Sequence, residues 1–228
     1  FRTIYCQFRI IYYKRRRKMK KYILNNLFSC FFGFFLIFSS LASAESVESV
    51  LDVTEEDFII GDENAPITII EYASLSCSHC ADFHINKLPE LIKEFVDTGK
   101  AKIVFRDFPF NYPALLGSMA LRCVPRDIRY EYSNALYQLQ SKWVFRENAK
   151  TTQELYKIMQ SGGMTKERFN ECIDNADLEN EILQGVMASQ SEFNIKSTPS
   201  FLVNGILIEG SKPIKDFRQI IDKILSEQ

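Results

Sequence analysis

The sequence is short of features that define several common classes of protein. Its 28 basic and 29 acidic residues leave a formal net charge of −1, which gives no electrostatic case for nucleic-acid binding. Only two histidines, His79 and His84, are present, and no second CxxC pair or HxxxH pair accompanies its one CxxC pair. A closed structural zinc site needs four nitrogen or sulfur ligands. We therefore expect no metal, no other cofactor and no nucleic-acid partner.

The longest apolar stretch is shorter than a typical membrane-spanning helix. It runs from about residue 27 to residue 41, roughly 15 residues, whereas a spanning helix needs roughly 20. Two lysines precede this stretch and an Ala-Ser-Ala sequence ends at residue 44, which is the order of a cleavable secretory signal. We expect Met19 to be the initiator and residues 1–44 to be an upstream extension and signal peptide. An uncleaved membrane anchor is the alternative.

Four cysteines remain after residue 44, namely Cys77, Cys80, Cys123 and Cys172. Export allows disulfides to persist, whereas they are rare in the cytosol. Because the number of remaining cysteines is even, the exported protein can be fully paired.

The motif Cys77-Ser78-His79-Cys80 is the most informative stretch. It follows the apolar run 67–72, which is typical of a buried strand, and precedes the helical pattern 81–96. At a helix N-terminus the Cys77 thiolate is stabilised by the positive end of the helix dipole and by unpaired N–H groups. The motif therefore indicates a redox-active dithiol, with half of a zinc site or a tight structural disulfide as alternatives.

The remaining patterns predict an α/β fold. Residues 102–107 form a second strand that is parallel to the first, and Pro89 kinks or splits the helix between them. Helical patterns fill most of 113–194. Asn204-Gly205 then predicts a hairpin, and 213–225 predicts an amphipathic terminal helix. We expect a lead-in at 45–56, one domain made of 57–112 and 195–228, and an inserted helical subdomain at 113–194.

Over about 57–228 the sequence resembles the DsbA-like class of thioredoxin-fold proteins, which are exported thiol-disulfide oxidoreductases. The segment from Glu71 to Cys80, the helical insertion, Thr198-Pro199 before the hairpin and the signal peptide carry the resemblance. It implies a thioredoxin-like fold, βαβ plus ββα, with the insertion between the halves. The best-known members have proline at position 78, so Ser78 leaves the redox potential open.

The resemblance also implies roles for five residues. Cys77 is the nucleophile, Cys80 is the resolving cysteine, and Thr198 and Pro199 form a cis peptide that binds substrate. Glu71 is a proton acceptor for Cys80, because a carboxylate on an apolar strand is costly without a role or partner. Alternatively, Glu71 reaches solvent at the strand edge or pairs with a lysine.

The two histidines receive different interpretations. His79 lies between the cysteines, where its charge or N–H acts on the Cys77 sulfur; the alternative is an ordinary, solvated residue at a helix N-terminus. His84 is interpreted as a partly buried helix residue outside the site.

Cys123 and Cys172 lie in separate helical segments and are expected to form a structural disulfide, with two free buried thiols as the alternative. A loop of about 50 residues closed in this way adds roughly 4 kcal/mol of stability in the chain-entropy model.

The expected function is to introduce disulfide bonds into exported proteins by exchange through Cys77 and Cys80. The partners would be unfolded or partly folded exported substrates and a membrane protein that reoxidises the dithiol, and the location would be the periplasm. The alternatives are a disulfide isomerase or reductase, a peptide-binding chaperone whose thiols are not needed, and a zinc-binding module.

Overall fold

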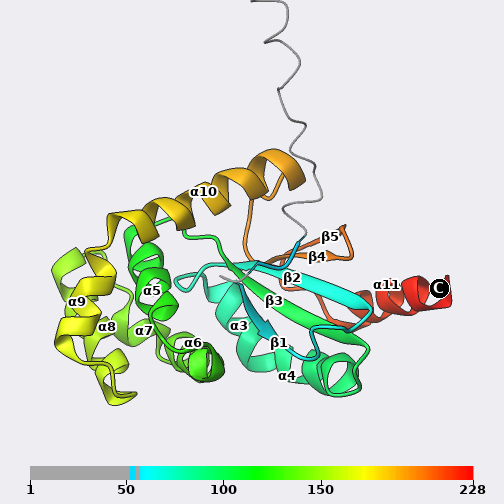
Figure 1. Cartoon of the computed structure of the whole chain (residues 1–228), viewed down its shortest axis with the longest axis horizontal. Coiled ribbons are helices and arrows are strands. Elements are labelled where there is room, and N and C mark those ends of the chain that lie inside the picture. Colours follow the sequence, from blue (N-terminus) through cyan, green and yellow to red (C-terminus); the bar gives the residue numbers. More distant parts are fainter. Residues whose placement is uncertain (1–51, 55–56, 228) are drawn as a thin grey trace, which may run out of the picture. The chain divides into compact units, whose positions relative to one another are not determined.

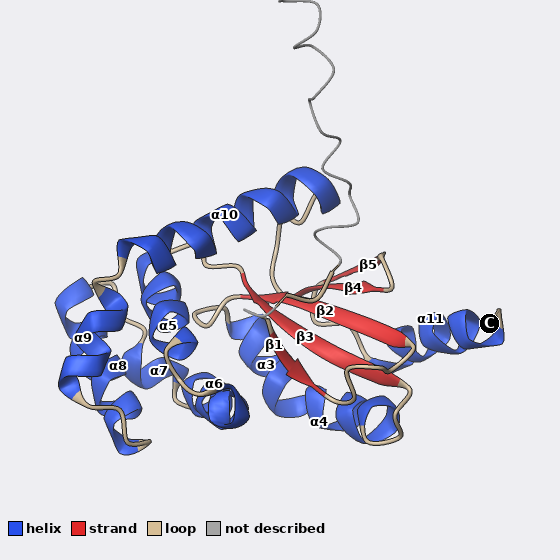
Figure 2. Ribbon diagram, in the orientation of Figure 1, coloured by secondary structure: helices blue, strands red, loops and turns tan. Residues whose placement is uncertain are grey.

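A five-stranded mixed sheet forms the centre of the structure (Figure 1, Figure 2). The computed structural model describes residues 52–54 and 57–227, so the predicted signal peptide, the start at Met19 and most of the lead-in lie outside the described residues. The strands are β1 (Phe58–Ile60), β2 (Ile67–Ala73), β3 (Ala101–Asp107), β4 (Ser200–Val203) and β5 (Ile206–Glu209). Their spatial order is β1-β3-β2-β4-β5, with β2 parallel to β3 and the other neighbours antiparallel.

Side chains of the central strand β2 alternate between two cores. Ile67 and Ile69 are fully buried on one face, and Ile70 and Tyr72 are buried in a different cluster on the other. Since successive strand residues point to opposite faces, Glu71 lies on the face of Ile67 and Ile69.

Helices on the Ile67 face carry and support the CxxC motif. The connection from β2 to β3 contains α3 (Ser78–Asn86), α4 (Leu88–Leu91) and the π-helical segment η2 (Ile92–Val96), and the chain ends in α11 (Ile214–Ser226). All four contribute buried side chains to the core that contains Ile67 and Ile69. This burial of one apolar face holds α3 against the sheet.

The chain between β3 and β4 is helical. Its elements are α5 (Tyr112–Arg122), the 3₁₀ turn η3 (Arg126–Ile128), α6 (Arg129–Gln138), α7 (Gln140–Trp143), α8 (Asn148–Ser161), α9 (Lys166–Ile173) and α10 (Ala176–Phe193). Trp143, Leu155 and Phe169 are completely buried in a core of their own, which also contacts Cys80. Figure 2 shows α10 running above the sheet, where its Val186 and Phe193 pack on the Ile70 face.

Several local predictions are confirmed. The two β strands around α3 are parallel, and Pro89 stands in the first turn of α4, where the missing N–H of a proline is tolerated. Asn204 and Gly205 both have positive φ (46° and 86°), as the two central residues of the predicted tight hairpin require. Strand β1 was not predicted, because three residues are too few to show a period.

Among the described residues, no helix has both the length and the apolar content that crossing a membrane requires.

Candidate active site

Contacts from distant elements hold the loop between β2 and α3. Cys77 is the N-cap residue of α3, with extended backbone angles (φ −83°, ψ 122°), and its N–H donates to the Ser74 carbonyl at 3.0 Å. From α7, the Gln140 amide donates to the carbonyls of Leu75 (2.9 Å) and Cys77 (3.0 Å). No sequence pattern singles out Gln140, because these bonds join residues 65 and 63 positions apart.

Cys77 is half-buried, and its Sγ lies 3.4 Å from the Thr198 carbonyl oxygen, to which the protonated thiol donates. The pKa of this thiol is lowered from 9.0 to about 5. The hydrogen bond from the Cys80 thiol is the largest cause, and the Thr198 hydroxyl and the backbone N–H groups of Cys80 and His79 lower the pKa further, against the effect of burial. Cys77 is therefore a thiolate at neutral pH, which makes it both a nucleophile and a good leaving group.

The Cys80 thiol is completely buried and keeps its proton. Burial is the largest cause of a pKa far above 9.0, and the hydrogen bond to Cys77 and the charge of Glu71 raise it further. The Ser74 N–H, 3.5 Å from the Cys80 Sγ, acts in the opposite direction. The two thiols of the motif therefore differ: Cys77 is ionised and partly exposed, whereas Cys80 is protonated and buried.

Thr198 and Pro199 lie beside this dithiol, and the peptide bond between them is cis. The Thr198 hydroxyl is buried. It lowers the pKa of both thiols, so it acts on both sulfurs. The Pro199 carbonyl accepts from the Gly210 N–H at 2.8 Å, which anchors the segment to the end of the hairpin.

His79 enters the site through its backbone. Its N–H lowers the pKa of Cys77, whereas its imidazole is exposed and makes no hydrogen bond to any residue that the structure describes. An effect of the imidazole charge on Cys77 stays a prediction.

Glu71 is completely buried and pairs with a residue that the sequence analysis placed outside the site. Its Oε2 lies 3.1 Å from Nε2 of His84, which is only 3% exposed. His84 is therefore buried rather than partly buried, and it contacts a predicted site residue. The alternative of a solvent-exposed or lysine-paired Glu71 was wrong. We call Glu71 and His84 the buried pair. The available signal was spacing, because His84 lies four positions after Cys80 and so on the same side of α3.

The second pair of cysteines is bridged. A disulfide joins Cys123, at the end of α5, to Cys172 in α9, with a Cα–Cα distance of 6.2 Å. Cys77 and Cys80 are free thiols. The part of the chain that the structure describes contains no group of three or more His, Cys, Asp and Glu side chains suited to a metal ion.

A dithiol at a helix N-terminus, a cis-proline segment beside it and this sheet order together define a thioredoxin-fold redox protein. The chain belongs to the thioredoxin family, whose model, described as Thioredoxin, matches residues 53–223. The predicted α/β class and the resemblance to DsbA-like oxidoreductases are confirmed.

Relatives were found among curated proteins and among solved structures. A protein of Rickettsia felis named putative protein-disulfide oxidoreductase is 29% identical over 184 residues, which cover 80% of this chain and 65% of the relative, slightly under two thirds of its length. The crystal structure of alpha-DsbA1 from Wolbachia pipientis has a TM-score of 0.73 and 29% identity over 80% of this chain and 96% of that one. Oxidised BdbD from Bacillus subtilis, at 22% identity and a TM-score of 0.67 over 75% and 94% of the chains, is similar in fold.

Proposed function

We propose that this protein forms disulfide bonds in exported polypeptides by thiol-disulfide exchange through Cys77 and Cys80. The proposal rests on the difference in pKa and in exposure between Cys77 and Cys80. A thiolate that is reachable at the helix N-terminus and a protonated thiol enclosed behind it are what a cycle of mixed-disulfide formation and resolution requires. The names of the relatives in Rickettsia and Wolbachia support the same reaction class.

The low pKa of Cys77 favours oxidation of substrates over their reduction. Stabilising the Cys77 thiolate stabilises the reduced protein and so makes its disulfide a stronger oxidant. The value of about 5 lies between about 3.5, known for the strong oxidant DsbA, and roughly 7 for the reductant thioredoxin. An isomerase or reductase is the competing assignment.

The exchange proceeds in two steps. A substrate thiolate attacks Sγ of Cys77 in the oxidised protein, the Cys77–Cys80 bond breaks, and Cys80 leaves and takes up a proton. A second thiolate of the substrate then attacks the substrate sulfur of the mixed disulfide, which forms the new disulfide and releases Cys77 as a thiolate. Glu71 supplies the proton in the first step, and accepts it when a reoxidising partner restores the Cys77–Cys80 bond.

The surface around the dithiol suits an extended, unfolded substrate. The Ser76 hydroxyl donates to Asn111 Oδ1 at 3.0 Å, which places the segment of Phe110 and Tyr112 next to the loop of Cys77. These two aromatic side chains are 57% and 41% exposed. Apolar side chains beside a reactive sulfur provide affinity without sequence selectivity, while the backbone of Thr198 pairs with the substrate backbone.

The proposed location is the periplasm, and the proposed reoxidant is a membrane protein. The Ala-Ser-Ala signal sequence supports export, and the Cys123–Cys172 disulfide suits an oxidising compartment. The substrates are newly exported proteins that still contain free thiols.

The reduction potential of the Cys77–Cys80 pair, measured against glutathione, tests the proposal. We expect a value closer to about −120 mV, as for strong oxidants of this fold, than to about −270 mV, as for thioredoxin. A value near the lower figure would assign the protein to the reductases. Zinc in the purified reduced protein would favour a metal-binding module instead.

A further inference from the structure

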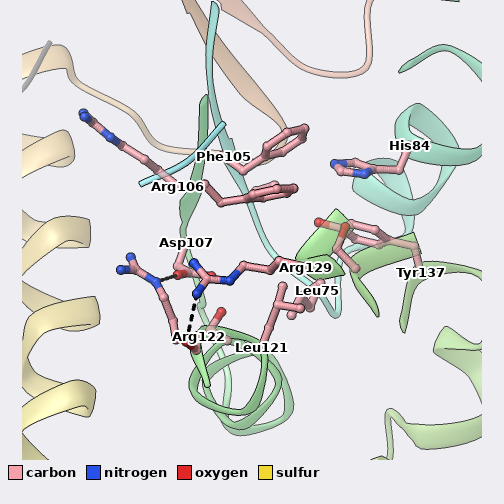
Figure 3. A pocket seen from close by; sticks show the side chains of 13 residues that line it. Leu75, His84, Phe105, Arg106, Asp107, Leu121, Arg122, Arg129 and Tyr137 are labelled. Atoms are coloured by element: carbon pink, nitrogen blue, oxygen red, sulfur yellow. Dashed lines mark hydrogen bonds and ion pairs between the residues drawn. The ribbon is translucent and has the colours of Figure 1, made fainter. Parts of the chain in front are cut away.

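A cavity lies between β3 and the helices α3, α5 and α6 (Figure 3). Its volume is about 40 Å³. His84, Ser118 and Ser133 line it from three different helices, and each is at least 95% buried, with exposures of 3%, 1% and 5%. Within the described residues, His84 Nδ1 and the hydroxyls of both serines have no hydrogen-bond partner.

Buried polar atoms that lack protein partners call for water. Such atoms are nearly always hydrogen-bonded, and the exceptions mark an ordered water, an ion or a catalytic role. A water molecule needs roughly 10–15 Å³ on this measure of volume and two to four polar partners. The cavity satisfies both conditions, because three unpaired polar atoms from α3, α5 and α6 line one space of sufficient size.

The buried pair connects this cavity to the dithiol. His84 uses Nε2 to contact Glu71, which leaves Nδ1 as the nitrogen on the other side of the ring. Glu71 in turn uses Oε2 for His84, and its Oε1 has no partner among the described residues. Because Cys80 and Glu71 are both 0% exposed, neither exchanges a proton directly with solvent.

We infer that His84 transfers protons between Glu71 and this hydrated cavity whenever Cys80 gains or loses its thiol proton. The inference rests on the proposed function. His84 acts through Glu71, so it is a positioning residue for the reaction. The proton of the buried Cys80 needs a route to water, and neither Cys77 nor Glu71 provides one. The His84 imidazole provides it by transferring protons between Glu71 and the cavity.

The proton balance is as follows for substrate oxidation. When Cys80 leaves Cys77 as a thiolate, it receives the proton of Glu71, which is replaced by the Nε2 proton of His84. In the same step a proton from solvent, carried as hydronium through the cavity water, binds Nδ1, so the ring stays neutral and no hydroxide is left in the cavity. The imidazole ends in its other tautomer and resets by exchange with water. During reoxidation every proton moves in the opposite direction. No electron passes through His84, since the two sulfurs exchange electrons only with the substrate and the reoxidant.

Other groups around the cavity do not compete for this proton. The titratable or charged side chains that face the pair or the cavity are Cys80 on α3, Arg106 and Asp107 on β3, Arg122 on α5, and Arg129 and Tyr137 on α6. Asp107 and Arg122 form an ion pair at 2.7 Å, and Arg129 donates to backbone carbonyls. Burial keeps the pKa of Tyr137 well above 10.0, so it stays a phenol, and its ring lies 4.2 Å from that of His84.

The variant His84→Gln tests this role. Glutamine keeps a donor for Glu71 but cannot bind and release a proton at neutral pH. Trp143 is the single tryptophan and packs in the cluster that contains Cys80, so its fluorescence in stopped flow follows reduction of the oxidised protein by a small dithiol. We expect reduction at pH 7 to slow about 100-fold, the lower end of the roughly 10²- to 10⁴-fold contribution that acid–base catalysis usually makes. The pH dependence of Cys77 alkylation should not change.

A second variant separates proton transfer from packing. In His84→Ala, added imidazole should restore at least part of the lost rate, whereas it should leave His84→Gln slow because the glutamine fills the space. Ser118→Ala should slow reduction by a smaller factor. Ser189→Ala is the matched control, since Ser189 is equally buried but lies on α10 and bonds to the Val186 carbonyl.

The inference is overturned if folded His84→Gln reacts as fast as the unmodified protein, if imidazole leaves folded His84→Ala unchanged, or if His84→Gln shifts the alkylation profile of Cys77. The last result would make the residue a structural support of the site. Failure of the proposed function is a different result, because it would appear as an absence of disulfide exchange in the unmodified protein.

Discussion

The two cysteine pairs in the described part of this chain show how differently the same residue behaves in two surroundings. Cys77 and Cys80 are three positions apart at the start of one helix and are free thiols with pKa values shifted in opposite directions. Cys123 and Cys172 are 49 positions apart and join α5 to α9. Hydrogen bonds from the Cys80 thiol, the Thr198 hydroxyl and backbone N–H groups make Cys77 reactive. The second pair closes a long loop.

The comparison predicts separate roles, in exchange chemistry for the first pair and in stability for the second. The largest expected effect comes from Cys77→Ser. It should reduce oxidation of a two-cysteine peptide to the rate without protein, because the other free thiol in the described part of the chain, Cys80, is completely buried. The double variant Cys123→Ala, Cys172→Ala is the control and should retain the activity. Activity that survives in Cys77→Ser would favour the thiol-independent chaperone.

A second experiment measures the reactivity of the first pair against pH. The rate of Cys77 alkylation in the reduced protein should fall as the pH is lowered, with a midpoint at about pH 5. At pH 7 its thiolate fraction is about 100-fold that of a thiol with a pKa of 9.0. Cys80 should stay unreactive through neutral pH. Rates from iodoacetamide labelling and mass spectrometry check both statements. A midpoint near pH 9 would contradict the lowered pKa of Cys77, on which the difference between the two thiols depends.

The same shift links stability to pH. The folded pKa of Cys77 lies below that of the unfolded chain, so the stabilisation is complete above about pH 9 and is lost as the pH falls through about 5. The free energy of unfolding of the reduced protein, measured in urea, should therefore decrease over this interval. Cys77→Ser should show a flatter dependence.

Removing the second disulfide should affect stability alone. We expect Cys123→Ala with Cys172→Ala to lower the free energy of unfolding by about 2–4 kcal/mol, since the closed loop spans about 50 residues. Chemical denaturation measures the loss, and the alkylation profile of Cys77 serves as the internal control. A shifted profile would mean that the second pair also tunes the first.

The smallest expected effect is that of Thr198→Val, which removes the hydroxyl that acts on both sulfurs. The pKa of Cys77 should rise above about 5, and the rate of peptide oxidation should change only a few-fold, because the other hydrogen bonds remain. Thr151→Val is the matched control. It removes a buried hydroxyl that bonds to Phe145 in the helical insertion, and should cost stability without moving the alkylation midpoint.

Features of the fold that depend on neighbouring residues could be predicted from the sequence. The CxxC turn, the helix break at Pro89 and the hairpin at Asn204-Gly205 each arise from the conformational preferences of a few adjacent residues. The start of α9 is equally local, because the hydroxyl of its N-cap residue Thr165 accepts from the N–H of Arg168.

Features that depend on distant contacts could not be predicted in this way. The partner of Glu71 is 13 positions away on another element, and a carboxylate in an apolar strand does not reveal which residue will meet it. Strand β1 is extended because it pairs antiparallel with the free edge of β3, which is distant in sequence. The cavity between β3 and α6 depends on how helices of the insertion stack on the sheet, which no local pattern encodes.

Gln140 has a consequence for how this protein can be engineered. Its amide, from a helix of the insertion, binds two carbonyls of the loop that begins at the sheet and ends at Cys77. The reactive loop is therefore assembled from both parts of the chain. A designer who trimmed residues 113–194 to obtain a minimal redox module would leave those carbonyls without their donor, and a transplanted CxxC segment would need a replacement for this one side chain.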